Sequence, residues 1–342
     1  KLQEPIQCLN ISFPVNTSDL GDVSVEDAIG RGNIAIKQTI GHQGLQSTMD
    51  YIDDRSSDNM KKGDFVYKDW VQSGEHANFL SREKIGRYSS KMKNICDMIA
   101  KSKGVVLIYS QFLDGGLIPM ALALEAMGIT RYGEKRKSLF KTPPSEPVEY
   151  KTMQSMKAEG NKSSSARYAM ITGDKRLSPS NISEILASTN DENKDGKMVK
   201  VILISMAGSE GVDLKFIRQV HILEPWYNMS RIEQIIGRAV RNNSHKLLSY
   251  SERNVMIFMY GTRLMDTDRE AADVSVYRSA EFKAIQIGNV NRLLKEVSVD
   301  CFLNQSQANF DENTINQKVR QVLSNGDVLE NYAVGDKNFS MV

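Results

Sequence analysis

The chain has few of the residues that mark disulfide-stapled, metal-binding or membrane-spanning proteins. Its 342 residues include 3 cysteines, 8 prolines and 2 tryptophans. Cys8, Cys96 and Cys301 are widely separated and odd in number, so neither a disulfide framework nor a zinc site fits them. We expect reduced thiols and no bound metal. No apolar run reaches the roughly 18 residues of a membrane span, so we expect no membrane partner.

Charge is also close to balanced over the whole chain. The formal net charge is +2, with 25% charged and 40% hydrophobic residues, which is ordinary for a globular protein. Overall charge therefore does not indicate nucleic-acid binding, and any such binding must come from local patches.

The most informative segment is residues 234–241, Gln-Ile-Ile-Gly-Arg-Ala-Val-Arg. Gln234, Arg238 and Arg241 stand four and three apart, so on a helix they form one polar stripe beside a packing side of apolar residues. Ser230 and Glu233 match a capping box at the start of this helix. Arginine side chains bond phosphate oxygens two at a time, so the stripe predicts an anionic partner.

Buried strands and helices alternate around this segment. Residues 199–204 predict a buried strand, which ends in a loop of small residues with two glycines at 205–214 that would let backbone approach a ligand closely. Further strands are predicted at residues 105–109, 219–223 and 254–260, and helices at 89–101, 116–127 and 277–297. Such alternation predicts an α/β fold, a parallel sheet with helices on both faces.

At this point the chain resembles a known family. Residues 205–214 resemble motif V of superfamily-2 helicases, and residues 234–241 resemble their motif VI, Gln-x-x-Gly-Arg-x-x-Arg. Residues 104–111 resemble motif IV, and 168–174 resemble the strand and loop that follow it.

The region from about 88 to 296 is similar to helicases of large nucleocytoplasmic DNA viruses. That group is related to the small subunit of the poxvirus early transcription factor and to poxvirus nucleoside triphosphate phosphohydrolase I. Two phrases carry this closer match, Val-His-Ile-Leu-Glu-Pro-Trp-Tyr-Asn at 220–228 and Tyr-Arg-Ser-Ala-Glu-Phe-Lys-Ala-Ile-Gln-Ile-Gly at 277–288.

The resemblance implies a domain organisation. Residues 86–262 would form the second RecA-like lobe, a P-loop NTPase-type sheet, with a loop insertion at 141–165. Residues 1–85 would be an irregular inter-lobe segment, and residues 263–342 a helical extension and tail. The chain has no Gly-Lys-Ser or Gly-Lys-Thr phosphate loop, so we expect it to be the C-terminal part of a longer protein.

The resemblance also implies roles at the nucleotide. Arg238 and Arg241 would be arginine fingers that reach the γ-phosphate of ATP, which the N-terminal lobe would hold with Mg²⁺. The ATP-binding residues would be Gln234, Gly211, Asp213 and Gly237. The alternatives are two surface arginines on an amphipathic helix, a solvated Gln234 and a capping or turn role for Asp213.

A second set of residues lies where the family binds the nucleic-acid backbone, at the ends of strands. Hydroxyl and backbone N–H groups there would bind phosphates without sequence preference. The residues are Ser110, Gln111, Thr172, Gly173, Ser205, Ala207 and Gly208. Ordinary strand-end turns are the alternative for each of them.

The expected function is the second lobe of a nucleic-acid-dependent ATPase, a helicase or translocase, acting in viral transcription and inactive without its first lobe. A non-catalytic docking module of a transcription or packaging complex is the alternative. The expected partners are the DNA or RNA backbone, the N-terminal lobe and the viral transcription machinery. The expected location is the host cytoplasm, in the viral factory, or the virion.

Overall fold

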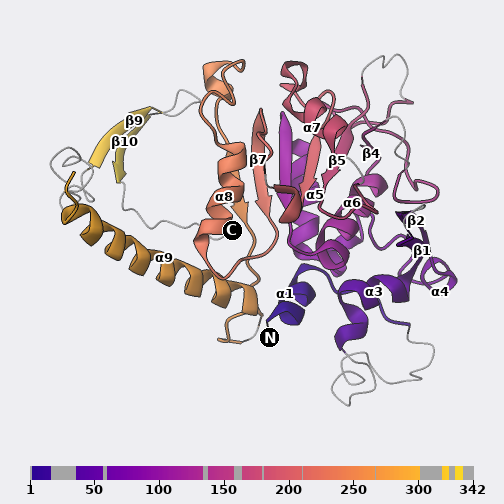
Figure 1. Cartoon of the computed structure of the whole chain (residues 1–342). Coiled ribbons are helices and arrows are strands. Elements are labelled where there is room, and N and C mark those ends of the chain that lie inside the picture. Colours follow the sequence, from indigo (N-terminus) through magenta and orange to yellow (C-terminus); the bar gives the residue numbers. More distant parts are fainter. Residues whose placement is uncertain are drawn as a thin grey trace.

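A six-stranded parallel sheet forms the centre of the molecule (Figure 1). The computed structural model describes residues 2–16, 36–56, 60–133, 138–157, 164–178, 181–209, 211–265, 267–300, 318–322 and 328–333. The strand order is β4-β5-β6-β3-β7-β8. The strands are β4 (Thr130–Arg131), β5 (Arg167–Ile171), β6 (Val201–Ile204), β3 (Val105–Tyr109), β7 (Ile217–Ile222) and β8 (Met256–Met259).

The central strands are apolar along their whole length because both faces of the sheet are covered. In β3, Val106 and Ile108 point into one core cluster, and Leu107 and Tyr109 point into the other. Helices α5 (Ser90–Lys101) and α6 (Ile118–Ala126) pack on the first face, and α7 (Ile182–Thr189) and α8 (Met229–Ala239) on the second. The expected α/β, RecA-like fold with helices on both faces is confirmed.

Because every strand pair in this sheet is parallel, the carboxyl ends of the strands share one edge. The loops after β3, β5, β6 and β7 therefore meet there, which is where open α/β sheets bind ligands. After β3 the chain makes a π turn, Leu113–Leu117, and passes directly into α6. Short 3₁₀ turns occur at Ile36–Thr39, Ile85–Arg87, Asp191–Asn193, Ala207–Ser209 and Tyr250–Glu252.

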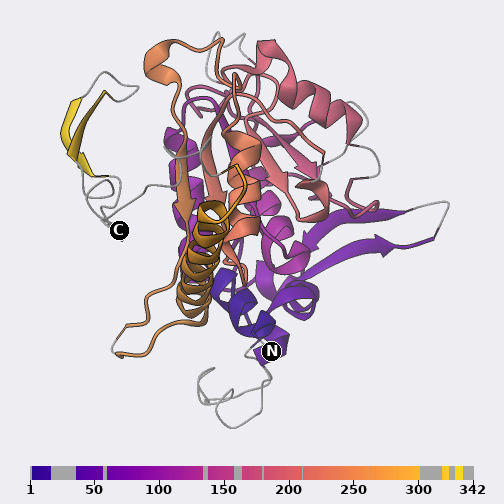
Figure 2. The ribbon, with the colours of Figure 1, turned by 60° about the vertical axis from the view of Figure 1, so that its left-hand side comes forward.

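The N-terminal segment is not irregular, so that part of the expectation is wrong. It contains α1 (Gln3–Asn10), α3 (Gly41–Thr48), α4 (Asp69–Gln72) and a hairpin of β1 (Met49–Asp54) and β2 (Lys61–Tyr67). Leu45 and Phe65 are buried in the same core cluster as α5, so long-range packing rather than local periodicity stabilises these elements. Figure 2 shows the hairpin reaching outward from the body of the molecule. Residues 17–35 lie outside the described residues.

The C-terminal extension begins with the expected long helix, α9 (Ala272–Glu296), which starts five residues earlier than its pattern suggests. Its first turns contact α1 and α8, and the rest runs out from the domain (Figure 1). Strands β9 (Lys318–Val322) and β10 (Val328–Ala333) pair beyond it, within a tail whose residues 301–317, 323–327 and 334–342 lie outside the described residues.

The insertion at 141–165 contains isolated bridges rather than helices or strands, and its residues 158–163 are also outside the description. Among the residues that are described, no helix is long and apolar enough to cross a membrane.

His221 on β7 is a structural histidine, as its place in an apolar strand indicates. Its ring is buried, stacks on Phe258 at 4.8 Å and bonds the Tyr260 hydroxyl at 2.8 Å and the Gln219 amide oxygen at 3.2 Å. Burial lowers the pKa of His221 to about 4. The folded state therefore resists protonation of this ring between about pH 6.5 and 4, whereas the unfolded chain accepts the proton.

We expect this difference to lower the free energy of unfolding as the pH falls from about 6.5 to 4, by about 3 kcal/mol. A His221→Phe variant keeps a stacking ring and lacks the titration, so it isolates the effect from other acidic groups. Urea unfolding at pH 7.5 and at pH 4 measures both proteins. The free energy of unfolding of wild type minus that of the variant should be lower at pH 4 than at pH 7.5. A difference that does not change with pH would refute the assignment.

Candidate active-site half and nucleic-acid interface

Gln234 and Arg238 lie on α8, whereas Arg241 follows the end of this helix at Ala239, so the expected single helical stripe is wrong for Arg241. Arg238 and Arg241 both contact the loop that joins β6 to β7. Arg238 donates to the Val212 carbonyl at 3.4 Å, and Arg241 pairs with the Asp213 carboxylate at 3.1 Å. Arg241 also donates through Nε to the Gly237 carbonyl at 3.1 Å. The structure thus brings four of the predicted nucleotide residues together at one place.

Arg241, Asp213 and Gln234 are exposed, and Arg238 is half-buried. The Asp213 and Arg241 side chains are 67% and 39% exposed, so their ion pair is weak and solvent-screened. Gln234 is exposed on α8, and its side chain makes no hydrogen bond with any residue that the structure describes. The two arginines can therefore turn from the loop toward an incoming anion at small cost.

The start of α8 differs from the predicted capping box. The helix begins at Met229, its N-cap residue is Asn228, and no side chain bonds its first amides. Ser230 instead donates to the Asn228 side chain at 2.9 Å. The box is wrong because the N-cap residue is Asn228, two residues before Ser230.

The glycines of the loop at 205–214 serve two different purposes. A side chain at Gly208 would place its Cβ 1.9 Å from the Ile171 carbonyl oxygen, so this glycine allows two strand-end loops to touch. It does not bring backbone toward a ligand, which corrects that part of the expectation. Gly211 has a φ of +73° and no atom within 4 Å of a Cβ, and Gly237 likewise faces open space. Backbone therefore stays open to a ligand at Gly211 and at Gly237.

Glu224, directly after β7, organises the edge of the sheet. Its fully buried carboxylate accepts from Asn10 at 2.7 Å, from the Ser110 hydroxyl at 3.0 Å and from the Gln111 amide at 2.5 Å. Burial raises the pKa of Glu224 to about 7, although these donors and Lys91 oppose the shift. One carboxylate thus holds α1 and the loop after β3 against the end of β7.

Lys91 and Asp273 form a buried ion pair behind Glu224. Their charged groups lie 2.8 Å apart, and the side chains are 3% and 0% exposed. Lys91 also donates to the Leu223 carbonyl at 3.2 Å, and Asp273 accepts from the amide and hydroxyl of Thr262. Helix α9 is therefore fastened to α5 and to the strand end.

A pocket of about 570 Å³ opens at the carboxyl ends of β3, β5 and β6, and we call it the strand-end pocket. Its walls come from the loops after the three strands and from the β1–β2 hairpin. They are lined by Arg55, Met60, Gln111, Leu113, Gly173, Asp174, Lys175, Arg176, Ser205, Met206 and Ala207. Four of the seven residues predicted to bind nucleic acid line this pocket.

The other three predicted nucleic-acid residues lie beneath it. Ser110 is buried and bonded to Glu224, and Thr172 is 2% exposed and donates to Ser178 at 3.1 Å. Gly208 is buried, and its amide donates to the Ser205 hydroxyl at 3.2 Å. Because burial and these bonds occupy them, the three residues support the pocket rather than face a ligand.

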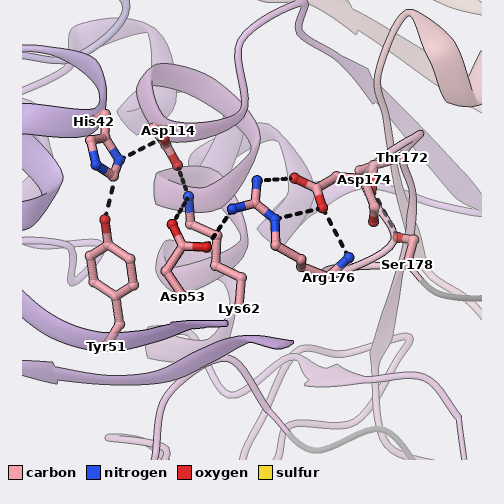
Figure 3. A network of polar contacts seen from close by, with 9 residues as sticks. All are labelled: His42, Tyr51, Asp53, Lys62, Asp114, Thr172, Asp174, Arg176 and Ser178. Atoms are coloured by element: carbon pink, nitrogen blue, oxygen red, sulfur yellow. Dashed lines mark hydrogen bonds and ion pairs between the residues drawn. The ribbon is translucent and has the colours of Figure 1, made fainter. Parts of the chain in front are cut away.

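A chain of ion pairs fixes the hairpin to the pocket (Figure 3). Lys62 bonds Asp114 at 2.6 Å and lies 3.8 Å from Asp53, and Arg176 bonds both Asp53 and Asp174. Burial opposes ionisation of Asp174, but the bonds from Arg176 outweigh it and lower the pKa of this carboxyl. The hairpin is thereby tied to the loops after β3 and β5.

The arrangement can supply two cations to a phosphoryl group, but it has no means of holding a nucleotide by its phosphates. Neither a phosphate loop in the sequence nor a cluster of metal-ligating side chains among the described residues accompanies the arginines.

Comparison with known proteins decides the family. The model of the helicase conserved C-terminal domain matches residues 90–243, which include the sheet core, the loop of Asp213 and the arginine helix. Residues 90–243 belong to the helicase conserved C-terminal domain family. The expectation drawn from motifs IV, V and VI is confirmed.

Viral proteins are similar to this helicase domain and its flanks. A protein of Acanthamoeba polyphaga mimivirus with the provisional name ATP-dependent RNA helicase R563 is 30% identical over 266 residues, covering 74% of this chain and 41% of that protein. A termination factor NPH-I homologue of African swine fever virus is 33% identical, covering 50% and 26%. Nucleoside triphosphatase I of Heliothis armigera entomopoxvirus is 36% identical, covering 35% and 18%. The chain spans less than half the length of each.

The sequence pattern missed the residues that the tertiary structure adds to this helicase domain. Arg55 and Met60 reach the pocket from the hairpin, and Asn10, Lys91 and Asp273 surround Glu224. Glu224 itself carried a signal, because a carboxylate between a buried apolar strand and Pro225 must find donors. The others are brought in by contacts distant in sequence.

The buried ion pair makes a prediction about stability. A Lys91→Met change keeps the aliphatic stem and leaves Asp273 buried without its cation, so we expect a loss of about 3–5 kcal/mol. Lys93→Met is the matched control, two residues away on the same helix, where the lysine forms a partly exposed pair with Asp97. That change should cost less than about 1 kcal/mol. Urea unfolding measures both, and equal losses would contradict the role of Lys91.

Proposed function

We propose that this chain provides the second lobe of a nucleic-acid-dependent ATPase, with Arg238 and Arg241 as arginine fingers. The single observation that carries the proposal is that the last turn of α8 and the residues just after it bring both guanidinium groups to the accessible loop of Asp213. In this account the pair between Arg241 and Asp213 opens when ATP, held with Mg²⁺ by a first lobe, reaches the lobe interface.

The physical reason lies in the charge of the transferring phosphoryl group. Negative charge spread over its oxygens needs cations in fixed positions, and an arginine finger contributes about 10³- to 10⁵-fold in rate. Arg238 is half-buried and Arg241 is exposed, and arginines held only by weak contacts can reorient at small cost. Gly211 and Gly237 leave open space beside them for a nucleotide.

Nucleic acid would bind on the strand-end pocket. Gln111, Gly173, Ser205 and Ala207 line it, and two strand-end loops present backbone there. Contacts of this kind give affinity without reading sequence, which suits a protein that moves along a strand. Closure and opening of two lobes, timed by hydrolysis, would then move the strand in steps.

The names of the relatives support a setting for this activity. An African swine fever virus relative is named a termination factor homologue, and others are named helicases or nucleoside triphosphatases. We place this chain in viral transcription on that ground, with 86–262 as the working lobe and with the transcription machinery as partner. The host cytoplasm, in the viral factory, or the virion is then its place of action.

The test of the arginine fingers is an alanine scan in the two-lobe protein. Arg238→Ala and Arg241→Ala should each lower kcat of nucleic-acid-stimulated ATP hydrolysis by roughly 10³-fold and change KM for ATP only a few-fold. The control is Arg292→Ala, which removes an exposed arginine of α9 paired with Glu296.

Steady-state ATPase assays with saturating nucleic acid measure all three variants. Wild-type rates of ATP hydrolysis in both Arg238→Ala and Arg241→Ala would refute the arginine fingers. A two-lobe wild type that binds nucleic acid and never hydrolyses ATP would instead favour a docking module.

A further inference from the structure

We propose that the β1–β2 hairpin is a nucleic-acid-binding element, and that the strand-end pocket it closes takes one unstacked nucleotide of a single strand. The hairpin spans residues 49–67 and lies outside the helicase-domain match at 90–243. The inference rests on the proposed binding of nucleic acid at the strand ends and adds a separate element and a strand preference to it.

The hairpin is held in a fixed position beside the pocket. The Lys62 side chain is 3% exposed and lies between Asp53 and Asp114, and Arg176 joins Asp53 to Asp174 (Figure 3). Backbone bonds add to this, because the Phe65 amide donates to the Leu139 carbonyl at 2.8 Å. A wall held by buried charges and backbone bonds is preorganised for a ligand.

The pocket carries excess positive charge. Three cations and one carboxylate line it, namely Arg55, Lys175, Arg176 and Asp174. Arg176 and Asp174 bond each other, which leaves Arg55 and Lys175 without an ion pair to any residue that the structure describes. Arg55 follows the end of β1 and Lys175 lies in the loop after β5, so the two accessible cations come from two different elements that line the pocket. A phosphodiester strand that lies on the pocket can contact both.

The pocket also has an apolar part that phosphates do not need. Met60 from the hairpin and Leu113 from the turn after β3 line it, and Met60 is 43% exposed. Methionine adapts its shape to flat and irregular partners. A volume of about 570 Å³ falls in the range of sites for small molecules, roughly 300–1,000 Å³.

Cations and apolar side chains in the lining of one pocket match a nucleotide whose base has left its stack. Bases in a single strand can turn out onto protein side chains, whereas flipping a base from a duplex costs a few kcal/mol. The pocket therefore favours a single strand over a duplex, and it contacts both the base and the phosphates.

Fluorescence anisotropy of the full chain with labelled 12-nucleotide strands tests this. The probes are oligothymidine, oligouridine, an abasic strand with the same phosphates, and a duplex. Met60→Ala should weaken binding of oligothymidine and oligouridine about five- to tenfold and leave the abasic strand unchanged. Arg55→Ala should weaken all three single strands and reduce the slope of log K against log salt by about 0.7.

The matched control is Val66→Ala, which also shortens a 43% exposed side chain on the hairpin, but one that does not line the pocket. It should leave every affinity unchanged. If wild type binds strands and Met60→Ala has no effect, or affects the abasic strand equally, the nucleotide pocket is refuted while backbone binding stands. If wild type binds neither the single strands nor the duplex, the proposed binding of nucleic acid itself fails.

Discussion

The carboxyl edge of the sheet depends on the buried ion pair between Lys91 and Asp273. A buried charge costs several kcal/mol unless it is paired and hydrogen-bonded. Lys91 satisfies this requirement with Asp273 and the Leu223 carbonyl, and thereby joins α5, α9 and the end of β7. Glu224, the residue after Leu223, accepts hydrogen bonds from Asn10 in α1 and from the backbone amide of Gln111 in the loop after β3. Segments before and after residues 90–243 thus contact the carboxyl edge of the sheet.

This edge connects the two proposed activities through one loop. Ser205 and Ala207 line the strand-end pocket, while Val212 and Asp213 of the same loop hold the two arginines. A strand that binds the pocket and a nucleotide that draws the arginines away would act on opposite ends of one short segment. Coupling between nucleic-acid binding and ATP hydrolysis then needs no long pathway, because one loop contacts both the strand-end pocket and the two arginines.

The sequence was informative where local pattern and burial coincide. Val105 to Tyr109 is apolar throughout because both faces of β3 are covered, and the shared face of Gln234 and Arg238 follows from helical spacing. Arg241 was expected on the same helix, which ends before it. It failed where distant contacts decide. The N-terminal hairpin is fixed by Lys62 and Asp114, 52 residues apart, so its strands have weak local signals and its pocket residues were not predicted. Ser110 and Thr172 were assigned to nucleic acid by their strand-end positions, but only tertiary structure shows that they are buried.

A structure of the two-lobe protein with Mg²⁺ and a mimic of the phosphoryl-transfer transition state tests the central claim most directly. The measured quantities are the distances from the Arg238 and Arg241 guanidinium groups to the phosphoryl mimic. Our account predicts that at least one of them lies within hydrogen-bond distance, about 2.7–3.2 Å, and that the contact between Arg241 and Asp213 has opened. A closed nucleotide site in which Arg241 still pairs with Asp213 and neither arginine reaches the mimic would contradict it.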